Sequence, residues 1–198
     1  MANVLIIGAT SVVGQRVTER LLQNTDDYLT LMARNTNMLS IDSNRGRLVH
    51  GDVLDDKPLN QALDGNEVVL VTADSNLGLS VQRIIDAMKK RQMNRLIFVT
   101  SMGLYNEIPV TDGASGNLTQ DALLKPYQTA VNMIENSNFN YTIIRPAEFD
   151  QGRDINYDLV NGALTSDTVS IDSVADCVAK LVIDKHLDSK KNLAICRK

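Results

Sequence analysis

Short apolar runs recur along the chain, and each is continuous rather than alternating with polar residues. Five of them are four or five residues long, and a weaker run lies between the second and the third. Runs of this kind are typical of strands that are covered on both faces of a parallel sheet. Six strands are therefore predicted, at residues 4–7, 29–33, 47–50, 68–71, 96–99 and 141–144. A last apolar stretch, 192–196, is predicted to add one edge strand.

Helical periodicity fills several of the intervals between these runs. Apolar residues recur three or four positions apart in segments 13–21, 81–88 and 174–182. Asp172 and Ser173 precede the third segment as a candidate N-cap. The alternation of strands and helices predicts right-handed crossovers and therefore a doubly wound, parallel α/β sheet. No repeat or linker divides the sequence, so a single domain is expected over residues 1–198.

Two segments are predicted to be irregular, 103–119 and 147–172. Each follows the carboxyl end of a predicted strand, the fifth in one case and the sixth in the other. Open α/β sheets bind their ligands at this edge. We therefore expect these two segments to form the walls of a substrate site.

A glycine turn follows the first predicted strand directly and opens the first predicted helix. Gly8 is expected to make the turn, Gly14 to allow close packing of the helix, and Ser11 to hydrogen-bond a phosphate oxygen in place of a glycine. Backbone amides at such a helix start favour a pyrophosphate. The same kind of turn also joins strands to helices in proteins that bind no nucleotide. The residues predicted to contact a dinucleotide here are Gly8, Thr10, Ser11, Val12, Val13 and Gly14.

The end of the second predicted strand indicates which dinucleotide binds. NAD-dependent folds place a carboxylate there for the ribose, whereas this chain has Arg34. A guanidinium can pair with a 2′-phosphate, so NADP (NADPH) is favoured over NAD. The alternative is that Arg34 is only a solvated charge.

Asp52 and Val53 follow the third predicted strand and are predicted to hold the adenine. The alternative is that Asp52 caps the next helix, a role that Asp55 or Asp56 can also fill.

Composition and charge narrow the class of protein. The chain has 198 residues and a formal net charge of −4, with no lysine-rich block, which argues against nucleic-acid binding. No apolar run approaches the roughly 20 residues that a membrane span needs, and the basic lead of a signal peptide is missing, so a cytoplasmic location is expected. Cys177 and Cys196 are expected to be free thiols rather than a disulfide. No metal site is predicted.

Three further segments carry a resemblance to a known superfamily: 96–103, 141–147 and 173–176. With the glycine turn, Arg34 and Asp52, they make the chain similar to atypical short-chain dehydrogenases/reductases, including the NmrA-like and flavin-reductase-like branches. The run 101–109 resembles a small bacterial and fungal branch of NAD(P)-binding oxidoreductases. The resemblance implies a Rossmann-type fold and assigns Ala73, Pro146 and Ala147 to the dinucleotide site, the last two beside the nicotinamide.

The chain departs from that superfamily at its Tyr-x-x-x-Lys pair. Alignment places Leu123 and Tyr127 at these two positions, and counting from Tyr127 itself finds Val131 in place of the lysine. The lysine of the pair normally lowers the pKa of the tyrosine that passes the proton. That mechanism is therefore not carried over to this chain.

The remaining candidates for chemistry follow the fifth and sixth predicted strands or open the next helix. Ser101 matches the superfamily serine that bonds a substrate carbonyl or the tyrosine and is also assigned to the dinucleotide site; the alternative is that it caps the strand end. Tyr105 is a candidate proton donor or a packing residue, and Tyr127 a ribose ligand. Glu148 and Asp150 are expected to contact substrate or to lie in a solvated loop.

These observations favour an NADPH-dependent reductase of a small flat acceptor, of flavin or quinone type. Such an acceptor needs little acid–base help from the protein. The alternative is a non-catalytic NADP sensor that regulates a partner protein. A sugar-nucleotide epimerase or dehydratase ranks third, because it needs the missing tyrosine and a large substrate domain. A monomer or a homodimer is expected.

Overall fold

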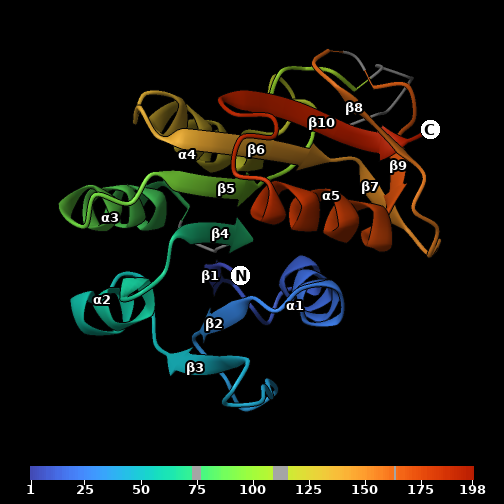
Figure 1. Ribbon diagram of the computed structural model, residues 1–198. Helices are drawn as coiled ribbons and strands as arrows, with labels where there is room; N and C mark the ends of the chain where they lie inside the picture. The colour runs from blue at the N-terminus through green and yellow to red at the C-terminus, as the bar shows by residue number, and fades with distance from the viewer. Residues whose placement is uncertain (73–76, 109–115, 163) are drawn as a thin grey trace.

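An eight-stranded sheet forms the centre of the computed structural model, which describes residues 1–72, 77–108, 116–162 and 164–198 (Figure 1). The strand order is β3-β2-β1-β4-β5-β6-β10-β8, and β7 and β9 form a separate two-stranded sheet. The strands are β1 (Asn3–Ile7), β2 (Tyr28–Ala33), β3 (Gly46–His50), β4 (Val68–Thr72), β5 (Arg95–Val99), β6 (Asn140–Pro146), β7 (Glu148–Asp150), β8 (Tyr157–Val160), β9 (Thr168–Ser170) and β10 (Lys191–Arg197).

The sheet is parallel from β3 to β10, and only the last pair, β10 with β8, is antiparallel. The chain runs outward from β1 to β3 and then returns to place β4 on the other side of β1. The order therefore reverses between β1 and β4, which is where such sheets bind ligands at the carboxyl ends of their strands. The predicted doubly wound fold is confirmed.

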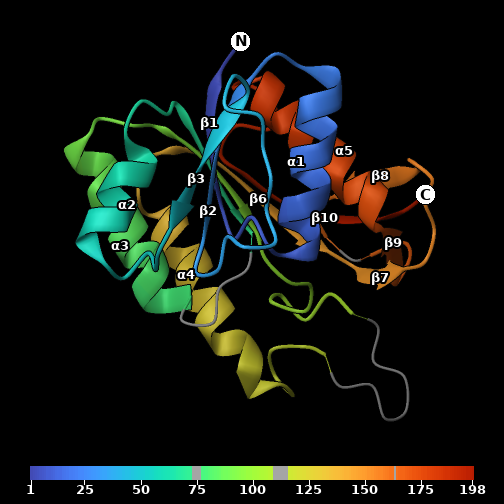
Figure 2. The same cartoon turned by 90° about the horizontal axis from the view of Figure 1, so that it is seen from below.

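Helices cover both faces of the sheet, and Figure 2 shows α1 and α5 on one side with α2, α3 and α4 on the other. The helices are α1 (Val12–Asn24), α2 (Asp56–Leu63), α3 (Leu77–Lys90), α4 (Lys125–Glu135) and α5 (Ile171–Ile183), with a short 3-10 helix η1 (Ala122–Leu124) before α4. Alternate residues of each strand enter the two layers. In β1, for example, Val4 and Ile6 belong to the core under α1 and α5, whereas Leu5 and Ile7 belong to the opposite core.

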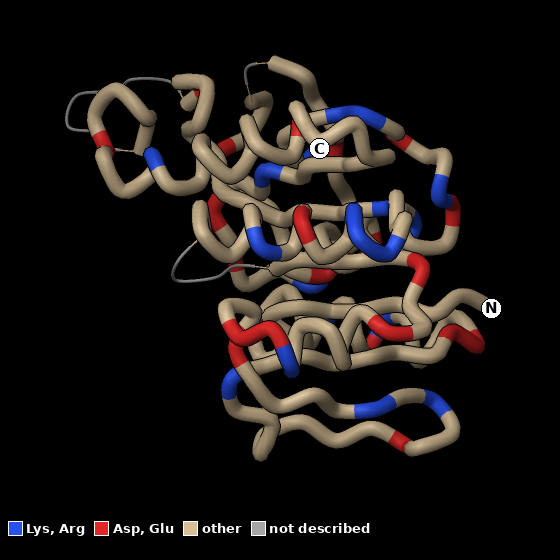
Figure 3. The backbone as a smooth tube through the Cα atoms, turned by 90° about the vertical axis from the view of Figure 1, so that its left-hand side faces the viewer, with Lys and Arg blue, Asp and Glu red and all other residues tan. Residues whose placement is uncertain are grey.

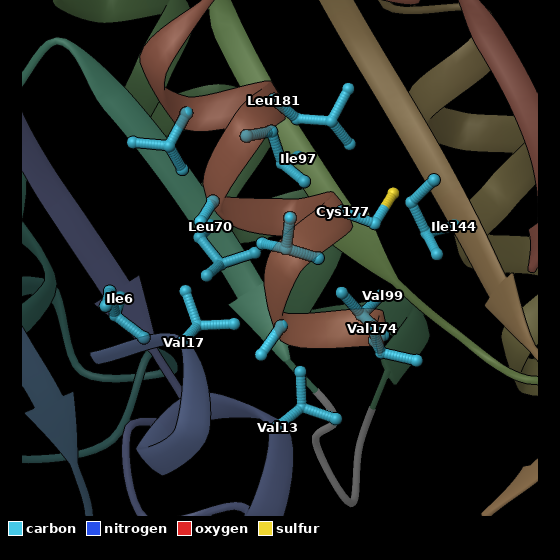
Figure 4. Packing of buried hydrophobic residues seen from close by; sticks show 14 of the residues in the cluster. Ile6, Val13, Val17, Leu70, Ile97, Val99, Ile144, Val174, Cys177 and Leu181 are labelled. Carbon is cyan, nitrogen blue, oxygen red and sulfur yellow. The ribbon is translucent and has the colours of Figure 1, made fainter. Parts of the chain in front are cut away.

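The core under α1 and α5 shows why the strands are continuously apolar. Val17 of α1 and Val174 of α5 meet the strand residues Leu70 and Ile97 (Figure 4). Cys177 lies in the same layer, and burial raises the pKa of its thiol to about 12. Both cysteines are buried and free, as predicted.

The carboxyl-terminal third contains more regular structure than predicted. Segment 192–196 was expected to be an edge strand, but β10 lies between β6 and β8, and β8 forms the edge. Segment 147–172 was expected to be irregular, but it contains β7, β8 and β9. Three or four residues of half-buried sequence are too short to show strand periodicity, which is why these strands were missed.

The predicted N-cap of α5 was also wrong. The cap is Ser170, whose backbone is extended and whose hydroxyl accepts the backbone N–H of Ser173 at 3.0 Å. Asp172 and Ser173 are already helical. Pro126, in contrast, lies in the first turn of α4 as predicted.

A charged network joins both helices of this layer to the sheet edge. The Asp176 carboxylate of α5 accepts from Arg20 of α1, from Lys180 at 2.7 Å and from the Tyr157 hydroxyl of β8 at 3.1 Å. Desolvation by burial opposes these bonds, but together the bonds from Lys180, Arg20 and Tyr157 hold the pKa of Asp176 below its ordinary value. Acidic and basic residues are scattered over the backbone in Figure 3, and α5 contains Asp172, Asp176 and Lys180.

We expect Asp176→Asn to lower the free energy of unfolding by about 1 kcal/mol at pH 7, because it weakens three bonds that solvent partly screens. A lowered carboxyl pKa stabilises the fold above the unfolded value near 4, and this contribution is lost as the pH falls through the folded pKa. The difference between the variant and the wild type in free energy of unfolding, measured by urea unfolding, should therefore be smaller at pH 3 than at pH 7. Asp26→Asn, at an exposed residue, is the control. An equal loss at both pH values would contradict the assignment.

Candidate functional site

A cavity of about 260 Å³ lies at the carboxyl ends of β1, β2 and β3. It brings together six of the residues that the sequence assigns to a dinucleotide, although these residues lie far apart in the chain. Its lining residues are Ile7, Gly8, Thr10, Ser11, Met32, Ala33, Arg34, Gly51, Asp52 and Val53. Residues predicted for the adenosine half of a dinucleotide site thus line a single cavity.

The turn between β1 and α1 requires both of its glycines. Gly8 has a φ of 83°, in the left-handed region that favours glycine, and its N–H donates to Met32 O at 3.1 Å. A Cβ on Gly14 would lie 2.4 Å from Gly8 O, closer than van der Waals contact allows. The first turn of α1 is therefore held directly against the carboxyl end of β1.

Ser11, which is predicted to bond a phosphate oxygen, also caps the first helix. Its Oγ accepts the N–H of Gly14 at 2.9 Å, and it lies 2.9 Å from the Thr72 hydroxyl. Thr72 in turn lies within hydrogen-bond distance of the carbonyls of Ile7 and Gly8. These bonds hold the Ser11 side chain in place, and Ser11 lines the first cavity. Its bond to a phosphate oxygen stays a prediction.

The two valines of the turn, Val12 and Val13, differ in how exposed their side chains are. The Val13 side chain is buried in the core, so only its backbone can face a ligand. Val12 is 67% exposed at the start of the helix. Since Ser11 already caps the Gly14 amide, the amides of Val12 and Val13 are the next donors at this helix start.

Across the cavity, Arg34, Asp52 and Val53 take the predicted positions. Asp52 does not cap α2: its Oδ1 accepts the N–H of Leu54 at 3.0 Å, while the N-cap position belongs to Asp55, which makes no side-chain cap bond. Val53 is buried, and Arg34 is exposed along the same wall. A carboxylate and a guanidinium therefore face one cavity.

A second cavity, of about 410 Å³, lies at the carboxyl ends of β5 and β6. Both predicted substrate-wall segments contribute to it, and so do Ser101, Pro146 and Ala147. Its lining residues are Thr100, Ser101, Met102, Gly116, Asp121, Leu124, Pro146, Ala147, Glu148 and Phe149. The two cavities open on the same edge of the sheet, because every strand that ends at them is parallel.

The second cavity combines hydroxyl groups with an apolar wall. The Thr100 Oγ1 is buried and has no hydrogen-bond partner in the part of the chain that the structure describes. Ser101 is half-buried beside it. Phe149 is 49% exposed and offers an aromatic face, and Met102 and Leu124 add apolar surface. Such a lining suits a flat, largely apolar molecule with one or two polar groups.

Val12, Val13 and Gly14 of the turn are not among the lining residues of either described cavity, and neither are three other predicted residues, Tyr105, Tyr127 and Asp150. Tyr105 packs against Arg145, whose guanidinium lies 4.8 Å from its ring centre, and its hydroxyl accepts from Asn192 at 2.8 Å. Burial raises the pKa of Tyr105, with Glu135 contributing, so the hydroxyl holds its proton more firmly. Tyr127 is half-buried against the core under α4. Asp150 pairs with Arg197 at 2.7 Å.

Ala73, the remaining predicted residue of the dinucleotide site, lies outside the described residues. Among the residues that the structure does describe, no group of three or more His, Cys, Asp or Glu side chains is placed to hold a metal ion. No helix in the described part of the chain is long and apolar enough to cross a membrane.

A buried ion pair behind the second cavity was not predicted. Arg145 Nε donates to Glu107 at 2.9 Å, and the two side chains are only 4% and 3% exposed. The pair ties the segment after β5 to the end of β6. The sequence did contain one indication of this pair. Arg145 directly follows the apolar run of a buried strand, and a buried charge needs a partner.

The fold, the glycine turn and the paired cavities define the class: an NAD(P)-binding Rossmann-fold protein of the oxidoreductase-like kind. Residues 8–185 match a family model described as NAD(P)H-binding, and the chain belongs to this family. The match begins at the first glycine of the turn and covers both cavities. No protein with a curated description matches the chain.

Solved structures agree with this membership. A Rossmann-fold NAD(P)-binding family protein from Shigella flexneri is 28% identical, over 100% of this chain and 94% of that one, with a TM-score of 0.81. A short-chain dehydrogenase/reductase from Veillonella parvula in complex with NADP is 24% identical, over 99% and 94%, with a TM-score of 0.87. An anaerobillin reductase from Escherichia coli is 18% identical, over 98% and 97%, with a TM-score of 0.78. The last two show likeness of fold. The predicted resemblance is confirmed.

We expect Gly14→Ala to lower the free energy of unfolding by about 1 to 3 kcal/mol, because the added methyl group must push α1 away from Gly8 O. The same shift should weaken dinucleotide binding. Urea unfolding followed by circular dichroism measures the first effect. Gly162→Ala is the matched control, since nothing lies within 4 Å of the added Cβ. Equal stability of the two variants would contradict the packing role of Gly14.

Proposed function

We propose that the protein is an NADPH-dependent reductase of a small flat acceptor of flavin or quinone type. The observation that carries this proposal is the pair of cavities on one sheet edge. One is lined by the glycine turn and Arg34, and the other by an aromatic side chain and hydroxyl groups. Their order along the edge, the first cavity at β1–β3 and the second at β5 and β6, suits a dinucleotide whose adenosine lies in the first cavity and whose nicotinamide reaches the second.

The residues of the first cavity fit NADP. The amides of Val12 and Val13 at the start of α1 would donate to the pyrophosphate. Arg34 would pair with the 2′-phosphate, and no carboxylate stands at that strand end to repel it. Asp52 would accept from the adenine amino group, and Val53 would pack against the ring. The Veillonella parvula neighbour that holds NADP supports this assignment.

The residues of the second cavity suit hydride transfer without a dedicated acid. Bound NADPH supplies a hydride, and a proton from water completes the two-electron reduction of the acceptor. Phe149 would pack on the acceptor ring, while the Ser101 hydroxyl would donate to its carbonyl oxygen as negative charge develops there. Tyr105 stays outside this chemistry, since its hydroxyl is engaged with Asn192. The Escherichia coli neighbour, described as a reductase, supports the reaction type.

A non-catalytic NADP sensor is the second candidate. It is favoured by the absence of the Tyr-x-x-x-Lys pair and by the position of Tyr127, which packs on the core. The two candidates differ in turnover rather than in binding. Oxidation of NADPH that depends on an added acceptor and is faster with the protein than without it favours the reductase.

We expect Arg34→Glu to raise the dissociation constant of NADPH about 10- to 100-fold and that of NADH far less, because it replaces an attraction to the 2′-phosphate with a repulsion. Titration followed by nicotinamide fluorescence gives both constants. Arg91→Glu makes the same charge change beyond the end of α3, at the other edge of the sheet, and should leave both constants unchanged. Equal weakening of NADPH and NADH by Arg34→Glu would refute the phosphate assignment.

We expect Ser101→Ala to lower kcat/KM for a quinone or flavin about 5- to 30-fold, because it removes one donor to the developing charge. Tyr105→Phe should leave kcat/KM within about twofold of wild type. Steady-state oxidation of NADPH with menadione and riboflavin provides the measurement. A protein that binds NADPH at micromolar concentration but turns over none of a panel of flavins, quinones and aldehydes would be the sensor instead.

A further inference from the structure

The cavity at the ends of β5 and β6 carries acidic charge. Two carboxylates, Asp121 and Glu148, line it, and no lysine or arginine does so among its described lining residues. Asp121 is fixed at the start of η1, where its Oδ1 accepts the N–H of Leu123 at 2.9 Å. Glu148 is exposed on β7, and its backbone N–H donates to Asp167 O at 3.0 Å. The two carboxylates therefore approach the cavity from its two walls.

Nearby positive charges are engaged elsewhere. Arg145 is enclosed and paired with Glu107, as described above. Arg197 is paired with Asp150 and Asp154. By sequence, segment 101–121 contains three acidic residues and no lysine or arginine. Lys125 and Arg153 flank the two walls, but both are exposed and neither lines the cavity.

The rest of the lining favours an apolar ring. Phe149, Met102 and Leu124 offer aromatic and aliphatic surface, and Ser101 offers a hydroxyl group suited to a neutral carbonyl. An acceptor with a carboxylate or phosphate near its ring would place a negative charge beside two others. We infer that the acceptor is an uncharged flat molecule, and that Asp121 and Glu148 determine specificity by excluding anionic acceptors. This inference rests on the proposed function and narrows its substrate class.

The expected size of the effect follows from Coulomb's law. Repulsion between unit charges that are several ångströms apart and partly screened by solvent changes binding by roughly 3- to 30-fold. Salt screens such a repulsion, so the discrimination should decrease at high ionic strength. A steric exclusion would show no such dependence.

Riboflavin and FMN provide the test, because they share one ring system and differ by a phosphate. We expect the full-length protein, saturated with NADP, to bind riboflavin at least roughly 10-fold more tightly than FMN, as measured by flavin fluorescence. The double variant Asp121→Asn/Glu148→Gln should bind FMN more tightly and riboflavin with little change, so that the ratio of the two affinities narrows roughly 3- to 30-fold. The ratio of kcat/KM values for NADPH oxidation should narrow in parallel. Asn at residue 121 keeps the side-chain cap of η1.

Asp86→Asn/Glu67→Gln is the matched control, because it makes the same change in net charge at exposed residues that do not line the cavity. It should retain the wild-type ratio. Three outcomes would each overturn the inference. The wild type uses both flavins equally, the cavity variant does not change the ratio of riboflavin to FMN affinity, or neither flavin binds. Charge-dependent flavin binding without turnover would refute the reductase and leave the charge selection standing.

Discussion

The close contact between Gly14 and the carbonyl of Gly8 is the constraint on which the site depends. It allows α1 to begin directly at the end of β1, and Ser11 completes the junction by capping the helix and reaching Thr72 of β4. β1 and β4 are the strands between which the order of the sheet reverses. One junction therefore fixes the position of the helix start, the floor of the first cavity and the point where the two halves of the sheet meet.

The sequence predicted this part of the molecule well because its signals are local. A continuous apolar run followed by a glycine turn leaves few alternatives for Gly8, and the run itself reports burial on both faces. The position of Arg34 relative to the turn followed from the expected fold, and the structure places both residues on one cavity. For the glycine turn and Arg34, a pattern in the sequence therefore corresponds directly to residues that lie together in the structure.

Prediction failed where the contacts are not local. Nothing in segment 147–172 alone indicates that β8 will pair with β10, because that pairing depends on residues more than thirty positions away in the chain. The contact between Ser11 and Thr72 could not be predicted either, because the two residues lie 61 positions apart in the chain. The same holds for Tyr105, whose packing on Arg145 and bond from Asn192 join segments that are distant in the sequence. In each case the missing information is the identity of a long-range partner.

The two cavities also differ in electrostatic character, and this difference orients the dinucleotide in the proposed function. In the proposed function the helix start and Arg34 would lie beside the phosphates and Asp52 beside the adenine, whereas the described lining of the second cavity holds two carboxylates, Asp121 and Glu148, and no lysine or arginine. Oxidised nicotinamide is a cation, so carboxylates near it favour the oxidised cofactor and thus the transfer of hydride to the acceptor. The same carboxylates raise the free energy of an anionic acceptor in that cavity. In the proposed function, selection of an uncharged acceptor and stabilisation of the oxidised nicotinamide would therefore be two consequences of one arrangement of charge along the sheet edge.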